Sequence, residues 1–173
     1  PRIFGEAGLG EKTALLSSIG IGVTNMIFTL LGVSLIDKVG RRTLMYIGSI
    51  GYIISLGLVT LAFFLNWSGI SIPIFLFLFI AAHAIGQGTV IWVFISEIFP
   101  NHLRASGQAF GSSTHWVLAA VIPSMIPFLF STIGAGSVFL VFTIAMIFQL
   151  LFVIFMMPET KGITLEKLSQ KLI

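Results

Sequence analysis

Residues 14–42, "ALLSSIGIGVTNMIFTLLGVSLIDKVGRR", decide the fold class of this chain. Residues 14–36 contain no charged side chain, whereas residues 37–42 carry four. About 20 apolar helical residues cross the hydrocarbon core of a bilayer, which is roughly 30 Å thick. Because the run is apolar on all sides and lacks the alternation of a barrel strand, it predicts a membrane-spanning helix that ends at a charged loop.

Four more apolar runs of similar length follow, separated by short segments with turn-forming or charged residues. They cover residues 43–65, 74–96, 106–131 and 138–157. The chain is 57% hydrophobic and 9% charged, with a mean hydropathy of +1.09. A soluble domain of this size needs more polar surface, so a soluble enzyme is excluded. The sequence therefore predicts an all-α membrane protein with five transmembrane helices within residues 14–157.

The distribution of Lys and Arg over the loops predicts the orientation of these helices. Seven of the nine cations lie in one alternating set of segments, 37–42, 97–105 and 158–173. Arg2 and Lys12 lie in the other set, which comprises residues 1–13, 66–73 and 131–137. By the positive-inside rule, the cation-rich set is cytoplasmic, and so is the C-terminus.

Composition also narrows the classes of partner and cofactor. The net charge of +3 does not indicate a nucleic-acid partner, because the cations are confined to loops and form no basic face. Cysteine is absent, and the three histidines are scattered, so we expect no catalytic constellation, no metal and no cofactor. The chain begins at Pro1 without a signal-peptide pattern and is interpreted as a piece of a longer protein.

Polar side chains inside the apolar runs are the candidates for a binding site, because each needs a partner or a cavity in the membrane. They are Asn25, His83, Gln87, His115 and Gln149. Trp92 and Trp116 lie deeper than an interfacial aromatic belt requires, although Trp116 could still belong to one. An aromatic face beside amide and imidazole groups suits a neutral sugar. A structural interhelical hydrogen bond is the alternative for Asn25.

Glycine and proline mark where these helices pack closely or break. Gly107 with Gly111, and Gly48 with Gly51, are typical of close helix packing. The segment "GQG" at 86–88 weakens a helix in its middle, and interrupted helices often line transport sites. The fourth helix is a candidate for kinking, since it contains Pro123 and Pro127.

Three motifs in this order resemble the sugar porters of the major facilitator superfamily. They are "DKVGRRTL" (37–44), "WVFISEIFP" (92–100) with Arg104, and "PETKG" (158–162). The resemblance covers nearly the whole chain and implies helices eight to twelve of a twelve-helix carrier with alternating access. Residues 1–13 would then hold the end of helix seven and an extracellular loop, and residues 158–173 a cytoplasmic tail. The N-terminal half of the same carrier is an implied partner.

The resemblance also assigns the substrate-binding residues. Asn25 matches a helix-eight Asn that contacts sugar, Trp92 a helix-ten Trp beside the sugar, and His115–Trp116 a polar–Trp pair on helix eleven. His83 and Gln87 complete the expected site. Gly86 and Gly88 match a flexible break on helix ten, where the family often has a proline that this chain lacks. Ala84, with its neighbouring His, is similar to fructose-type members and hints at a ketose.

A second expected site is a charge cluster on the cytoplasmic face, which in this family closes the inner gate. Its members here would be Asp37, Arg41, Arg42, Glu97, Arg104 and Glu159. The alternative, that the charges are only topology signals and snorkelling ends, suits Lys38 and Lys161. It does not suit Glu97, because a carboxylate adds little to topology and is costly to desolvate.

The expected function is therefore transport of a monosaccharide, a hexose or pentose, across the plasma (bacterial inner) membrane by alternating access. Coupling to protons or facilitated diffusion both remain open, because the first helix is absent. A major facilitator carrier for a non-sugar solute is one alternative. A channel or a non-transporting scaffold is another. Residues 164–172 are expected to form a short surface helix.

Overall fold

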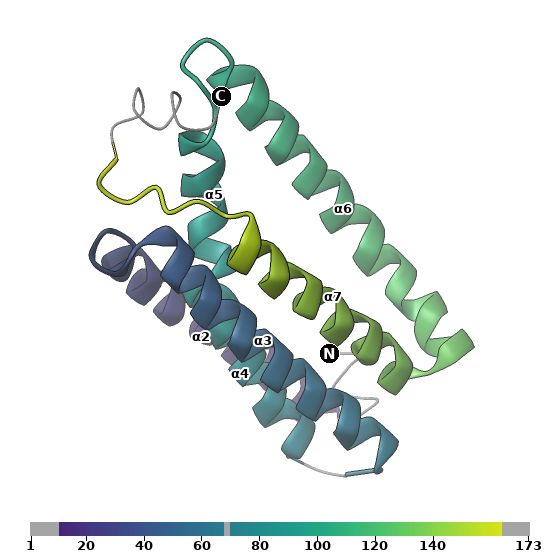
Figure 1. Cartoon of the computed structure of the whole chain (residues 1–173). Coiled ribbons are helices and arrows are strands. Elements are labelled where there is room, and N and C mark those ends of the chain that lie inside the picture. Colours follow the sequence, from purple (N-terminus) through teal and green to yellow (C-terminus); the bar gives the residue numbers. More distant parts are fainter. Residues whose placement is uncertain (1–10, 68–69, 164–173) are drawn as a thin grey trace.

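The structure is a computed structural model that describes residues 11–67 and 70–163, so the helix expected at 164–172 lies outside the described residues. Its helices are α2 (Glu11–Val39), α3 (Arg41–Phe64), α4 (Ser71–Ile85), α5 (Gln87–Glu97), α6 (Arg104–Ile133) and α7 (Ala135–Phe155) (Figure 1). The described part of the chain contains no strand. Five helical spans are long and apolar enough to cross a membrane, with α4 and α5 together forming the span Ser71–Glu97. The predicted all-α membrane fold with five transmembrane helices is confirmed.

Three pairs of helices are joined by a single glycine, and at two of these links the glycine has a positive φ. Gly40 connects α2 to α3 with a φ of 101°, and Gly134 connects α6 to α7 with a φ of 80°. Residues with a Cβ rarely adopt a positive φ, so glycine is the residue that permits such short connections. Arg41 and Arg104 begin their helices and Glu97 ends one, so residues that hydropathy places in loops lie within helix ends.

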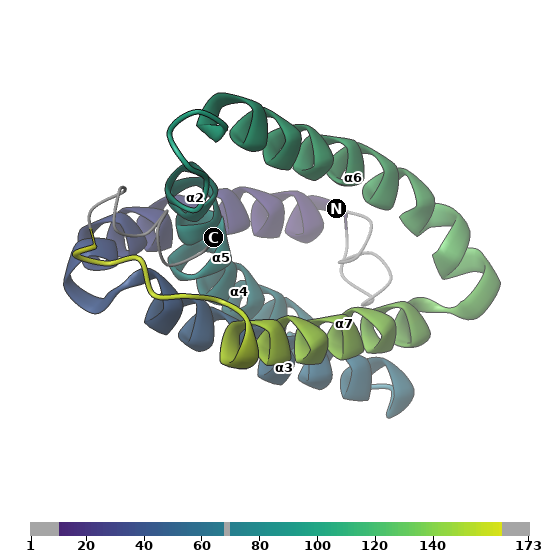
Figure 2. The same ribbon diagram turned by 45° about the horizontal axis from the view of Figure 1, so that its top comes forward.

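Helix α3 lies at the centre of the packing. It packs chiefly against α7 and α4, while α2 packs chiefly against α4. Figure 2 shows α3 beside α7 along one side of the molecule and α6 along the other. The side chains of α2 and α6 are largely exposed, including large apolar ones such as Leu30 and Phe110. Such exposed apolar surface is expected of helices that face lipid or other membrane helices.

Two apolar clusters fill the interior at different levels along α3. The first joins α3, α4, α6 and α7 and includes Val59, Leu76 and Phe139. The second lies toward the start of α3 and includes Leu44 and Val90. The part of α3 between the clusters carries the buried polar side chains Ser49 and Tyr52. A polar layer therefore separates two apolar layers in the middle of the bundle.

The expected break in the third membrane span lies at Gly86, which has φ −97° and ψ −100° and separates α4 from α5. A Cβ on Gly86 would lie 2.7 Å from the Cα of Gly48, and one on Gly48 would lie 2.2 Å from Oε1 of Gln87. The break thus lies where the backbone of α3 touches the backbone of the α4–α5 span. Gly107 is likewise covered by the Phe99 ring, 2.4 Å from an added Cβ.

The two prolines of α6 do not end the helix. Pro123 and Pro127 both lie inside α6, which is assigned as helix from Arg104 to Ile133. Each proline removes the N–H donor of the carbonyl four residues before it, which frees the carbonyls of Ala119 and Pro123. The Ser124 hydroxyl donates a 2.7 Å hydrogen bond to the neighbouring carbonyl of Ala120.

Candidate functional site

A cavity of about 450 Å³ lies at the level of the polar layer, and its volume falls in the range of small-molecule sites. Side chains of α3, α4, α5, α6 and α7 surround it. The lining residues are Met45, Tyr52, His83, Gln87, Gly88, Ile91, Trp92, His115, Met146, Gln149 and Phe152. No Asp, Glu, Lys or Arg of the described residues is among them. The cavity is therefore aromatic and polar but carries no carboxylate, ammonium or guanidinium group.

One wall of the cavity is aromatic and joins α5 to α6. The rings of Trp92 and His115 meet edge to face, with centroids 4.8 Å apart and planes at 74°. Trp116 packs against both, at 6.2 Å from Trp92 and 5.4 Å from His115, but does not line the cavity. Mutual contacts limit the orientations open to the Trp92 indole, which suits a fixed stacking surface.

Amides and hydroxyls form another part of the cavity lining or contact it. Nε2 of Gln87 donates to Oγ of Ser49 over 3.0 Å, and Nε2 of Gln149 reaches the same oxygen over 3.5 Å. Oε1 of Gln87 is buried without a hydrogen-bond partner among the described residues. The Tyr52 hydroxyl makes a hydrogen-bonding contact with Nδ1 of His83. Hydroxyl-rich solutes can bind such donors and acceptors in a neutral site.

The structure brings together some of the sequence-predicted binding residues and not others. His83, Gln87, Gly88, Trp92 and His115 line one cavity. The remaining predicted residues do not line it. Asn25 is exposed on α2, Gly86 is buried against α3, Trp116 lies behind Trp92, and Ala84 is fully buried.

Gln149, an amide inside an apolar run, was among the sequence candidates and lines the cavity, although the family resemblance did not assign it to the substrate site. Tyr52 also lines the cavity and was not predicted. Its signal in the sequence was weak. Tyr52 follows Ser49 by three residues, so helical spacing places both polar groups on one face of α3.

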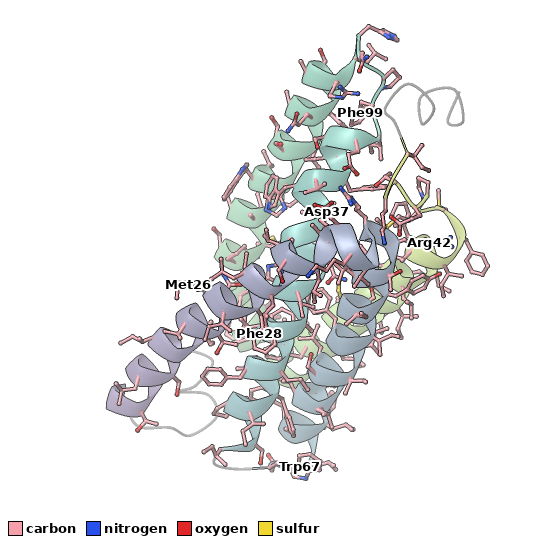
Figure 3. All side chains as sticks on the ribbon, turned by 90° about the vertical axis from the view of Figure 1, so that its left-hand side faces the viewer. Met26, Phe28, Asp37, Arg42, Trp67 and Phe99 are labelled. Carbon is pink, nitrogen blue, oxygen red and sulfur yellow. The ribbon has the colours of Figure 1, made fainter. Side chains whose placement is uncertain are left out.

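The second site lies at the end of the bundle opposite Trp67, where Figure 3 shows Asp37, Arg42 and Phe99. Arg41 is its centre. The guanidinium donates to both carboxylate oxygens of Glu97, over 2.8 and 3.2 Å, and to Asp37 over 2.9 Å. Thr160 adds a 2.6 Å hydrogen bond from its hydroxyl to Glu97. The Asp37 side chain is 82% exposed and that of Glu97 only 19%, so the Arg41–Glu97 pair is the stronger contact.

Within the described part of the chain, no guanidinium binds the carboxylate of Glu159. Its carboxylate accepts the backbone N–H groups of Arg41 and Arg42 over 3.0 and 3.1 Å, at the start of α3. Gly40 precedes this helix and has no side chain to cap it, while a Cβ there would lie 2.6 Å from the carboxylate. The carboxylate therefore takes the place of a side-chain cap and faces the positive end of the helix dipole.

Arg42 makes the reciprocal contact with α7. Its guanidinium donates to the carbonyls of Val153 and Ile154 over 3.1 and 2.5 Å, in the last turn of α7. These carbonyls lack helical partners, and a cation beside them opposes the negative helix end. Helices α3 and α7 thus cap one another through Arg42 and Glu159, and we call this pair of contacts the α3–α7 clasp.

Arg104 does not join the cluster. Nη2 of Arg104 reaches the carbonyl of Phe99 over 3.4 Å, and its Nε is buried without a partner among the described residues. Lys161 donates to the carbonyl of Lys38 over 2.5 Å. The predicted six-residue cluster is therefore observed as an ion-paired group around Arg41 and Glu97, the separate clasp, and Arg104 apart from both.

Comparison with known proteins identifies the family. The family described as "Sugar (and other) transporter" matches residues 1–172 of the 173. The chain belongs to the sugar transporter family. Its fold is similar to part of the solved structure of the MFS (major facilitator superfamily) proton:xylose symporter XylE bound to 6-bromo-6-deoxy-D-glucose, with a TM-score of 0.85 and 31% identity over 96% of this chain and 36% of that one.

Curated sugar transporter relatives agree with this assignment. The arabinose-proton symporter of Bacillus subtilis is 36% identical over 98% of this chain and 37% of its own length. The D-xylose transporter of Levilactobacillus brevis is 34% identical over 99% of this chain and 38% of its own length. The chain thus spans less than two fifths of the length of these relatives. Membership of the family confirms that the chain is an integral membrane protein and not an enzyme.

Proposed function

We propose that this chain forms part of a carrier that transports a monosaccharide by alternating access, as a facilitator or a proton symporter. The observation that carries the proposal is the neutral cavity of about 450 Å³ lined by Trp92, Gln87 and Gln149. A sugar ring can stack its apolar C–H face on an indole and place its hydroxyls toward amides. Strong selection for an ionic solute would instead require a charged group in the cavity.

The names of the relatives support a pentose or hexose as substrate. Two of them are an arabinose-proton symporter and a D-xylose transporter, and the matching solved structure is a proton:xylose symporter. The same names support protons as the coupling ion. The remainder of the carrier, including its N-terminal half, would supply the groups that face the cavity from the other side.

Helix α5 connects the cavity to the charge cluster and suggests how the carrier is gated. It begins at Gln87, in the cavity wall, and ends at Glu97, in the ion pair with Arg41. Eleven helical residues span about 16 Å at ~1.5 Å per residue, and Gly86 separates this rod from α4. In this proposal, the Arg41–Glu97 contact closes the inner gate and is lost when the carrier opens inward.

The same proposal places the cluster on the cytoplasmic face of the plasma (bacterial inner) membrane. The support is the bias of Lys and Arg toward one set of loops. It puts Arg41, Glu97 and Glu159 on the cytoplasmic side and Trp67 on the outer side. Accessibility of single cysteines at Trp67 and Lys161 to a membrane-impermeant reagent in intact cells tests this orientation.

Counterflow in proteoliposomes tests the proposed transport. The full-length carrier is reconstituted, loaded with unlabelled pentose or hexose, and given a trace of labelled sugar outside. We expect the label to accumulate transiently above its equilibrium level, and we expect Trp92→Ala to reduce this overshoot at the same sugar concentration. A channel or a scaffold gives no overshoot. Uptake that no hexose or pentose inhibits would identify a carrier for a non-sugar solute instead.

A further inference from the structure

We propose that Tyr52 positions His83, so that the imidazole presents its Nε2–H group to the substrate as a hydrogen-bond donor. The inference rests on the proposed function. It adds α3 to substrate recognition through a residue that belongs to none of the sequence motifs.

Two rings, those of Tyr52 and Phe79, hold His83 in place. The Tyr52 hydroxyl contacts Nδ1 of His83, and the Tyr52 side chain is buried, with 6% of its surface exposed. The Phe79 ring lies 4.9 Å from that of Tyr52 and stacks on that of His83 at 6.4 Å and 25°. Phe79 and His83 are four residues apart on α4 and so share a helix face. The imidazole therefore has little freedom to rotate.

The contact with Tyr52 decides which nitrogen of His83 carries the hydrogen. Among the described residues, the Tyr52 hydroxyl has no hydrogen-bond partner other than Nδ1 of His83. If Nδ1 carried the hydrogen, this buried hydroxyl would be left without an acceptor among the described residues, so the arrangement in which Tyr52 donates is favoured. In a neutral imidazole, an accepting Nδ1 places the hydrogen on Nε2.

Nε2 of His83 has space beside it and makes no hydrogen bond to any described residue. Gly88 follows the helix break, and a Cβ there would lie only 3.1 Å from Nε2. His83 lines the cavity, and no hydrogen bond to its Nε2 is formed within the described part of the chain. The second imidazole of the cavity, that of His115, lies on α6 against the Trp92 and Trp116 rings. The fixed donor of His83 is thus available to an oxygen of a bound sugar.

Nitrogen-15 spectroscopy of histidine in the full-length carrier tests the positioning directly. The two tautomers have distinct chemical shifts, and the signal of His83 is assigned by its loss in His83→Gln. We expect protonated Nε2 and unprotonated Nδ1 in the wild type, and a mixture in Tyr52→Phe. Protonated Nδ1 in the wild type, or no change in Tyr52→Phe, would overturn the proposal. This readout stands whether or not the carrier transports sugar.

Transport by Tyr52→Phe tests the consequence for the substrate. The half-saturation concentration should rise about 3- to 10-fold with an unchanged maximal rate, as expected for the weakening of one hydrogen bond. The matched control is Tyr46→Phe, which removes a hydroxyl of the same helix that contacts Arg42 over 3.4 Å outside the cavity. We expect no change in half-saturation for this variant.

Monodeoxy sugars separate positioning from a general structural effect. In the wild type, one deoxy position should cost affinity because it removes the oxygen that accepts from His83. In Tyr52→Phe, the affinity of that deoxy analogue should differ less from the affinity of its parent sugar than it does in the wild type. The other analogues should keep their affinities relative to the parent sugar. Equal weakening of every analogue would show a merely structural role. If no sugar is transported by any form, the proposed function fails, and the tautomer measurement alone decides the positioning.

Discussion

At the scale of single residues, Glu97 and Glu159 carry the same charge at the same end of the bundle but have different partners. Glu97 binds the guanidinium of Arg41 and the hydroxyl of Thr160. Glu159 binds backbone N–H groups at the start of α3. The contact of Glu97 joins α5 to α3 through two side chains, whereas that of Glu159 caps the start of α3 and holds the segment after α7 against it. We therefore expect the two carboxylates to affect different properties of the carrier.

The first prediction concerns Glu97→Gln in the full-length carrier. Removing the charge weakens the contact with Arg41 and should shift the carrier toward the inward-facing state. Labelling of single cysteines should increase at the cytoplasmic face and decrease at the outer face. Asp37→Asn is the control, because the Asp37 side chain is largely exposed and its pair with Arg41 contributes little. Unchanged labelling in Glu97→Gln would exclude the proposed gate.

The second prediction concerns the aromatic wall. Trp92→Ala removes the indole that lines the cavity, and we expect a loss of about 1–2 kcal/mol in sugar binding, or roughly a 5- to 30-fold higher half-saturation concentration. Trp67→Ala is the control, since Trp67 lies at the end of α3, away from the cavity, and packs on Phe75. Equal effects of the two changes on binding would show that Trp92 is not a substrate contact.

At the scale of elements, each residue of the segment "GQG" (86–88) makes a different contribution to the packing around the helix break. Gly86 allows backbone contact with Gly48 of α3, Gln87 reaches Ser49, and Gly88 leaves space beside His83. The break between α4 and α5 therefore sets the register of α3 against the cavity wall. The family's frequent proline is not needed for this break, because the close approach of two glycines accompanies it.

The third prediction tests this crossing. Gly86→Ala places a Cβ 2.7 Å from the Cα of Gly48 and 3.0 Å from the carbonyl of Leu44, so the backbone must move. Overpacking of this kind costs about 1–3 kcal/mol, and we expect a lower Tm in detergent together with impaired transport. The control is Gly57→Ala on α3, where an added Cβ lies 3.9 Å from its nearest neighbour and should be tolerated. A wild-type Tm for Gly86→Ala would contradict the crossing.

At the scale of the whole molecule, the contacts divide the bundle into a fixed part and a part that can move. The clasp and the extensive packing of α3 on α7 hold these two helices together. By contrast, α5 is a short rod with a break at one end and an ion pair at the other. In the proposed mechanism, α5 moves against the α3–α7 pair.

The fourth prediction follows from this division. Glu159→Ala leaves the N–H groups of Arg41, Arg42, Thr160 and Lys161 without their acceptor and should cost about 1–3 kcal/mol of stability. We expect a lower Tm in detergent and an unchanged ratio of inward to outward cysteine labelling. Lys161→Ala, at an exposed position, serves as the control with little effect on Tm. If Glu159→Ala and Glu97→Gln changed the Tm and the labelling ratio in the same way, the division into a fixed α3–α7 pair and a moving α5 would be refuted.

Hydropathy and the positions of the motifs were sufficient to predict the all-α fold and five membrane helices, because lipid imposes helix on an apolar run. The break at Gly86 also followed from two glycines around an amide. The partners of Glu159 could not be predicted, because a sequence shows charges but not the free N–H groups at the start of a helix. Tyr52 was missed because an aromatic residue in an apolar run resembles ordinary core. Asn25 and Arg104 fell outside the observed sites because helix rotation decides which side chains face inward.

The single-glycine connections limit the kinds of movement open to the bundle. Gly134 is the whole link between α6 and α7, and Gly40 the whole link between α2 and α3. One residue offers almost no length to extend, at most about 3.6 Å. At these ends, neighbouring helices can therefore swing about a common pivot but cannot slide past each other by a helical turn, which is about 5.4 Å. The glycine links consequently permit changes in the angle between neighbouring helices but not shifts along their axes.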